Sequence, residues 1–152
     1  ICAEMVGCGV DPYTVAQHVY GTYSLGRIKL LNMALDSIEV SPNGKLSLMT
    51  LTREMFTETE THPEDVDGMI NYAKRIEDVQ VAAMIMENTN GHAPPTIGGK
   101  RYHVSLRSDG TVDVADIAGS FGGGGHMSAA GFQIKSTLSN LKTEIITLSE
   151  KL

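Results

Sequence analysis

Residues 79–86, Val-Gln-Val-Ala-Ala-Met-Ile-Met, are nearly continuous in apolar side chains. Such a run is typical of a β-strand that other elements cover on both faces, at the centre of a sheet. Residues 100–107 alternate instead, because Tyr102, Val104 and Leu106 take every second position and polar residues take the others. Alternation predicts a strand with one face in the core and one polar face. The chain is therefore expected to fold around a sheet that carries helices.

Turn and capping signals divide the rest of the chain into further strands and helices. Asn43-Gly44 lies between segments 38–40 and 45–52, which predicts a hairpin of two antiparallel strands. A short strand is expected over residues 132–135. Helices are expected from Pro12 (with Val15, Val19 and Tyr23 on one stripe), from about Ser24, from Pro63 to about Arg75, over 113–121 and over 137–152. The predicted fold class is α/β (α+β): a mixed sheet of about five strands with packed helices, preceded by a helical linker.

Length and charge limit the classes of protein to which the chain can belong. Its 152 residues allow one ordinary core plus an appendage. The net charge of −6 argues against long-range attraction to a polyanion, so a phosphate ligand needs a local site. Cys2 and Cys8 lack CxxC spacing, which favours a reducing cytoplasm, and no apolar run approaches the roughly 18 residues of a membrane span. The start at Ile1 is what a fragment or a processed protein would show.

Four consecutive glycines, 122–125, precede His126. Each glycine loses more backbone freedom on folding than any other residue, so an ordered run needs compensation. A flexible linker is one reading, but the flanking Phe121 and Phe132 favour a phosphate cradle of backbone N–H groups. Residues 126–130 are predicted to begin a short helix capped by Gly131, which would add a helix N-terminus to the cradle. His126 is predicted to donate a ring N–H to phosphate, with a purely structural histidine as the alternative.

Arg107 and Ser108 lie where the alternating strand ends. A guanidinium there could hold a phosphate through two parallel hydrogen bonds, and the hydroxyl could add a third. The alternative is a solvated arginine, as we expect for Arg101 on the same face. The acidic residues of 58–67 are better explained as a solvated first helical turn than as catalytic carboxylates. No metal site is predicted, because no histidine shares metal-ligand spacing with a carboxylate pair.

Three segments taken in order resemble a known family: Leu106-Arg107-Ser108, Val112-Asp113-Val114, and Gly-Gly-Gly-Gly-His126 followed by Ala-Ala-Gly-Phe132. They are similar to the DHH-associated domain, type 1 (DHHA1), which forms the C-terminal half of many DHH phosphoesterases. The subgroup that they resemble most is the bifunctional oligoribonuclease and pAp phosphatase, or nanoRNase, type. The resemblance covers roughly residues 38–152 and is more specific than a lone glycine motif.

The resemblance implies a division of labour between two domains. An N-terminal DHH domain of the same polypeptide would bind two divalent metals, usually manganese, and hydrolyse a phosphoester with a metal-activated water. The DHHA1 domain would hold the substrate, a short oligoribonucleotide or 3′-phosphoadenosine 5′-phosphate (pAp). Residues 1–36 then correspond to the end of the catalytic domain and a linker helix, and 37–152 to the DHHA1 domain. The family's substrate contacts match Arg107, Ser108, Gly123, Gly124, Gly125 and His126.

The sequence departs from a whole enzyme of this family in one respect, since it contains no Asp-His-His triplet. The chain alone is therefore expected to be inactive, with no catalytic residue and no metal of its own. The loop over 88–99 is also longer than expected and could change the substrate rim. Cyclic-dinucleotide phosphodiesterases, exopolyphosphatase-like proteins and RecJ-type exonucleases are alternatives, as is a non-catalytic nucleotide-binding or dimerisation module. The chain is also a candidate for forming a homodimer.

Overall fold

The computed structural model describes residues 1–88 and 99–152, so the expectation for the 88–99 loop falls almost entirely outside the described residues. Within these residues the strands form one six-stranded sheet with the order β1-β2-β3-β4-β6-β5. Only β2 and β3 run parallel; the other neighbours are antiparallel. The strands are β1 (Glu39–Val40), β2 (Leu46–Leu51), β3 (Val81–Glu87), β4 (Lys100–Ser108), β5 (Gly124–His126) and β6 (Ala129–Ser136). The predicted mixed α/β fold is confirmed.

Strand β3 lies inside the sheet, as its apolar run predicts. Its side chains alternate between two cores, with Val81, Ala83 and Ile85 on one side and Ala82 and Met84 on the other. Because β2 and β3 are parallel, the chain must cross from one end of the sheet to the other between them. That crossover contains the helices α4 (Arg53–Thr59), η1 (Pro63–Val66) and α5 (Ile70–Lys74).

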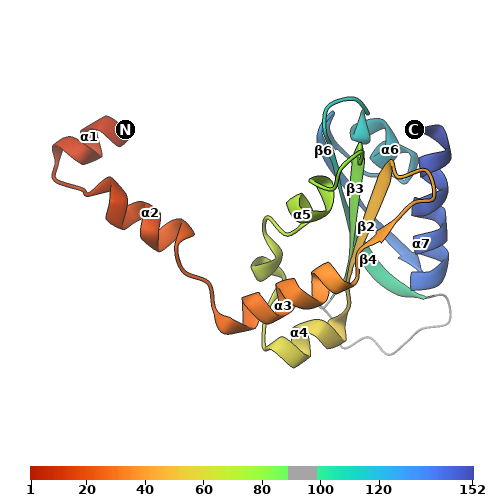
Figure 1. Cartoon of the computed structure of the whole chain (residues 1–152), viewed down its shortest axis with the longest axis horizontal. Helices are drawn as coiled ribbons and strands as arrows, with labels where there is room; N and C mark the ends of the chain where they lie inside the picture. The colour runs from red at the N-terminus through yellow and green to blue at the C-terminus, as the bar shows by residue number, and fades with distance from the viewer. Residues whose placement is uncertain (89–98) are drawn as a thin grey trace.

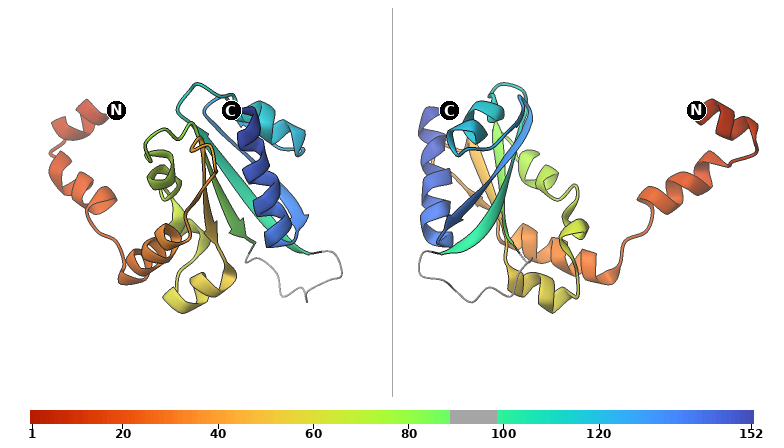
Figure 2. Two further views of the ribbon diagram at one scale, coloured as in Figure 1. Left: turned by 45° about the vertical axis from the view of Figure 1, so that its right-hand side comes forward. Right: turned by 180° about the vertical axis from the view of Figure 1, so that it is seen from behind.

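Helices cover both faces of the sheet, as Figure 1 and the two views of Figure 2 show. One face carries α6 (Val114–Ser120) and α7 (Leu138–Thr147, continued by η2, Leu148–Lys151), and its core includes Leu141 and Ile145. The other face carries α3 (Leu25–Asp36), α4 and α5, with Leu30 and Phe56 in its core. On this second face α5 packs on β3 and also contacts β2 and β4, whereas β5 and β6 make their main helix contacts with α6 on the first face.

The helix starts that capping predicts are confirmed. Asp11 accepts hydrogen bonds from Tyr13 N and Thr14 N at the start of α2 (Pro12–Tyr20). Ser24, Asp113 and Thr137 cap α3, α6 and α7 through their side-chain oxygens. Each cap satisfies a backbone N–H that the first helical turn cannot pair by itself.

The crossover differs from the prediction of one helix from Pro63 to Arg75. The chain forms the short 3₁₀ helix η1, turns at Gly68 with φ +80°, and then forms α5, whose C-cap is Arg75. A left-handed residue cannot continue a right-handed helix, so Gly68 separates the two pieces. Sequence reasoning also missed α4, which begins directly after β2.

The N-terminal helices α1 (Cys2–Gly7) and α2 extend away from the sheet (Figure 1). No residue of α1 is buried, and the predicted stripe of α2 is exposed, with 47% of Val15 and 60% of Val19 accessible. By contrast, α3 packs on the core through Leu30 and Ala34. The predicted domain boundary near residue 36 stays a prediction. No helix in residues 1–88 and 99–152 combines the length and apolar character needed to cross a membrane.

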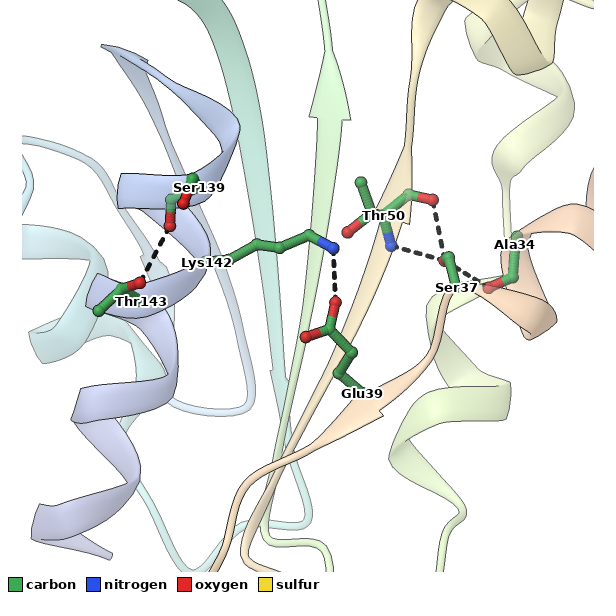
Figure 3. Close-up of polar contacts among 7 residues, drawn as sticks. All are labelled: Ala34, Ser37, Glu39, Thr50, Ser139, Lys142 and Thr143. Carbon is green, nitrogen blue, oxygen red and sulfur yellow. Dashed lines mark hydrogen bonds and ion pairs between the residues drawn. The ribbon is translucent and has the colours of Figure 1, made fainter.

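Side-chain hydrogen bonds join α3 and α7 to strands of the sheet (Figure 3). Ser37 Oγ accepts from Thr50 N at 2.9 Å and lies 2.7 Å from Ala34 O and 2.9 Å from Thr50 O, to either of which it can donate. This hydroxyl joins the C-terminal end of α3 to β2. Lys142 Nζ on α7 donates to Glu39 Oε1 on β1 and joins the opposite layer to the edge of the sheet.

Candidate phosphate-binding site

The glycine run forms a β-hairpin, which corrects the prediction of a short helix over residues 126–130. Gly124, Gly125 and His126 pair with Gly131, Ala130 and Ala129, and residues 127–128 make the turn. The turn is held from both sides, because Val114 N donates to Met127 O and Ser108 N donates to Ser128 O. Extended pairing uses the backbone that a helix would need, so His126 stands at the end of a strand and no helix N-terminus lies there.

Two of the glycines are required by close approach between β5 and β6. A Cβ at Gly123 would lie 2.2 Å from Gly131 O and 2.5 Å from Phe132 Cβ. A Cβ at Gly125 would lie 2.5 Å from Ala129 O, and its φ of +152° disfavours other residues. Any side chain at either position would push the hairpin apart. Phe121 then stacks on Phe132 with ring centroids 4.3 Å apart, on the covered side of the sheet.

The strand register places Arg107 and His126 on the same face. Arg107 pairs with Ala129, and Ala129 pairs with His126, so the three side chains form one row across β4, β6 and β5. Directly paired residues share a face of the sheet. Two strand spacings separate the Cα atoms of Arg107 and His126 by about 10 Å. This is the face opposite α6 and α7, since the alternate residues Leu106 and Ala130 belong to the core under those helices.

Next to this row the sheet surface is bare backbone. Gly124 pairs with Gly131, which pairs with Ser105, and a Cβ at Gly124 would meet nothing within 4 Å. The following row on the same face is the pair of His103 and Gln133, and the His103 ring would lie 3.7 Å from a Cβ at position 131. A glycine floor therefore lies between Arg107 and His126 on one side and His103 and Gln133 on the other.

The polar groups around the floor are available to a ligand. Arg107 Nη1 donates to its neighbour's carbonyl, Leu106 O, at 2.9 Å, which leaves the remaining N–H groups of the guanidinium. Within residues 1–88 and 99–152 the side chains of His103, Ser105, Gln133 and His126 have no hydrogen-bond partner, and no acidic side chain pairs with Arg107. The arrangement offers several donors to an anion.

Ser108 occupies a different environment from Arg107. Its side chain is buried, with 2% exposed, and Ser108 Oγ accepts hydrogen bonds from Gly110 N at 2.9 Å and Val112 N at 3.4 Å. These bonds hold the turn that leads from β4 to α6. The predicted contact between Ser108 and a nucleotide stays a prediction.

The same turn lowers the pKa of Asp109. The Thr111 hydroxyl donates to its carboxylate at 2.6 Å and Thr111 N donates at 2.8 Å, and both bonds favour the ionised form. Asp109 N in turn donates to Gln80 O, which connects the turn to the residues before β3. The carboxylate thus supports the loop that follows Arg107.

Sequence reasoning found Arg107, Gly124 and His126 and missed the other side of the floor. The alternation puts His103 on the polar face of its strand without a role, Gln133 falls in the strand expected over 132–135, and Gly131 is predicted to cap a helix that does not form. The signal that would have identified them is the pairing of β4 with β6, which fixes Gln133 opposite His103. Local patterns do not give the register of two strands separated by a helix and a hairpin.

Comparison with known proteins found one matching domain family and several similar structures. The DHHA1 domain matches residues 45–151. An exopolyphosphatase-related protein from Bacteroides fragilis has a similar structure with a TM-score of 0.77 and 25% identity, over 96% of this chain and 41% of that chain. A pGpG-specific phosphodiesterase from Vibrio cholerae has a TM-score of 0.49 and 13% identity, over 81% of this chain and 38% of that chain. The chain thus spans about two fifths of the length of these structures.

Proposed function

The chain belongs to the DHHA1 domain family, and on that basis we propose that the face of β4, β6 and β5 opposite α6 and α7 binds the phosphate groups of a substrate for a DHH-family phosphoesterase. One observation carries the proposal: Arg107 and His126 stand beside a bare glycine floor, and neither has an acidic partner in the described part of the chain. A guanidinium binds phosphate through two parallel hydrogen bonds, and an imidazole N–H adds a donor from across the row. The absent Cβ atoms let the ligand approach the backbone.

The substrate that we propose is a short oligoribonucleotide, pAp, or both, as in the nanoRNase type. The order of the segments around Arg107 and His126 supports this choice. The proposed partner is the N-terminal DHH domain of the same polypeptide in the cytoplasm, and a homodimer remains to be tested. Gly123 and Gly125 contribute by letting β5 approach β6, and Gly124 contributes the floor itself.

A divalent metal, usually manganese, belongs to the catalytic domain that the resemblance implies. The residues described here do not fit such a centre, since no group of three or more His, Cys, Asp or Glu side chains in 1–88 and 99–152 could hold a metal ion. We therefore propose a binding role for this chain and place no hydrolytic step on its side chains.

The test compares two arginines on one strand. Arg107→Ala and His126→Ala should each weaken the binding of pAp and of a two-residue RNA about tenfold or more, because each removes a charge-assisted or directed hydrogen bond. Arg101→Ala is the matched control, since Arg101 lies on the same strand and face but six residues away, about 20 Å from the site. Equal calorimetric affinities for all four proteins would refute the site. Circular dichroism confirms that each variant is folded.

The likeness to the exopolyphosphatase-related protein favours a second candidate ligand, inorganic polyphosphate. The floor and its donors recognise phosphate oxygens and need no base. If polyphosphate binds through Arg107 and His126 more tightly than pAp or the RNA, the exopolyphosphatase-like reading replaces the nanoRNase reading. Chromatography of the products formed after addition of the DHH domain and manganese also distinguishes these two hypotheses.

A further inference from the structure

A cavity lies between α3 and residues 67–75, apart from the glycine floor. It has a volume of about 170 Å³. Its apolar lining includes Leu31 and Met69, its aromatic lining is Tyr23 and Tyr72, and its cations are Arg27 and Arg75. None of the lining residues comes from β4, β5 or β6. The cavity is therefore distinct from the proposed phosphate site.

One wall of the cavity is a preformed planar stack. The Arg27 guanidinium lies over the Tyr23 ring, with Cζ 4.1 Å from the ring centroid. Arg27 Nη2 also donates to Asp67 O at 2.7 Å, which fixes the guanidinium between the ring and the backbone of the crossover. A guanidinium is planar, so one fixed in this way offers a surface on which an aromatic ring can stack.

The part of the lining that comes from α5 and its C-cap provides an aromatic ring, Tyr72, and a cation, Arg75. Tyr72 is 50% exposed although it lines the cavity. Arg75 follows Tyr72 by three residues at the end of α5, so both lie on one side of that helix. In the described part of the chain Arg75 has no ion-pair partner. The lining carries two guanidinium groups against one carboxylate, that of Asp67, so it favours an anion.

The size of the cavity restricts what can enter. Small-molecule sites usually measure about 300–1,000 Å³, so 170 Å³ admits one ring system and leaves the rest of a ligand outside. The Asn71 carboxamide in the lining can donate to and accept from such a ring. From these observations we infer that the cavity binds the base of a nucleoside monophosphate, with its ring at Tyr72 and the Arg27–Tyr23 stack and its phosphate at Arg75.

The test uses AMP, adenosine and inorganic phosphate with this chain carrying Arg107→Ala, which disables the proposed phosphate site. Calorimetry should still detect AMP binding, weakened about tenfold by Tyr72→Ala, in line with the loss of one base–aromatic contact. Arg75→Ala should weaken AMP about tenfold but leave adenosine nearly unchanged, because it removes only the phosphate contact. Inorganic phosphate alone should bind far more weakly than AMP.

Tyr13→Ala is the matched control, since Tyr13 is exposed on α2 and does not line the cavity. The inference is overturned if Tyr72→Ala and Arg75→Ala bind AMP as tightly as the control does, or if AMP binding vanishes with Arg107→Ala alone. The second result would leave the proposed phosphate site intact. Conversely, if Arg107→Ala binds phosphate ligands as tightly as the parent protein does, the proposed phosphate site is refuted. The Tyr72→Ala variant then still decides whether AMP binds in this cavity.

Discussion

Adjacent glycines of the hairpin should respond to the same substitution in opposite ways. In Gly123→Ala the added methyl meets Gly131 O at 2.2 Å and Phe132 Cβ at 2.5 Å, so β5 must shift away from β6. Overpacking of this kind costs about 1–3 kcal/mol, against a gain of about 0.4–1 kcal/mol from the stiffer unfolded chain. We expect a net loss of about 1.3 kcal/mol in the free energy of unfolding. For a chain of this size that lowers the melting temperature by about 3–5 °C.

In Gly124→Ala the methyl meets nothing within 4 Å, and the backbone has no positive φ. The only remaining effect is that alanine makes the unfolded chain less flexible, which stabilises the folded state. The melting temperature should therefore rise by about 1–4 °C. The same methyl, however, stands on the floor between the polar walls and displaces a ligand. A displacement that costs about 1 kcal/mol weakens pAp affinity about fivefold.

Thermal melts followed by circular dichroism, and calorimetry with pAp, measure both quantities on both variants. A Gly123→Ala protein that melts within 1 °C of the parent would show that β5 and β6 are not in the contact described. A Gly124→Ala protein that binds pAp like the parent would show that the ligand does not touch the floor. Because the two residues are neighbours, a nonspecific effect on the hairpin cannot produce the crossed pattern.

Three further perturbations test the framework. Ser37→Ala removes the hydroxyl that joins α3 to β2 and leaves Thr50 N unpaired, which should cost about 1–3 kcal/mol in urea unfolding; a change below 0.5 kcal/mol contradicts the bridge. Leu141→Ala leaves a cavity at a fully buried position of α7 and should lower the free energy of unfolding by about 2–5 kcal/mol in the same measurement, a loss that an alanine substitution at an exposed site should not cause. The pKa of Asp109 is lowered below its ordinary 3.8, so its stabilising effect is present above about pH 4 and is lost as pH falls through the folded value. Asp109→Asn should flatten the melting temperature against pH between about pH 2 and 5, and an unchanged profile would contradict this.

The parts of the fold that the sequence predicts are those decided within a few residues. Caps such as Asp11 and Asp113 bond to backbone N–H groups two or three positions away, so their signals survive in any tertiary setting. The alternation of β4 and the apolar run of β3 likewise reflect which faces are covered. These predictions are confirmed because local chemistry and global packing agree.

The errors arise where a distant segment decides the backbone. Residues 126–130 contain nothing that forbids a helix. Ala129 and Ala130 are extended because they pair with β5 in the hairpin and with β4 more than 20 residues earlier in the chain. The same pairing brings His126 into one row with Arg107 and puts His103 beside the floor. The residues of the candidate site could therefore be named in part, but their common face could not be derived without the register.

Strand β5 lies at the edge of the sheet, although along the chain it falls between two inner strands. Its hydrogen bonds to β6 can open without disturbing β2, β3 or β4, so the hairpin can unfold locally while the core stays folded. Amide hydrogens of residues 124–126 should exchange with solvent far faster than those of β3. Binding of a phosphate ligand to the glycine floor should therefore slow amide exchange at this hairpin before it changes the global melting temperature.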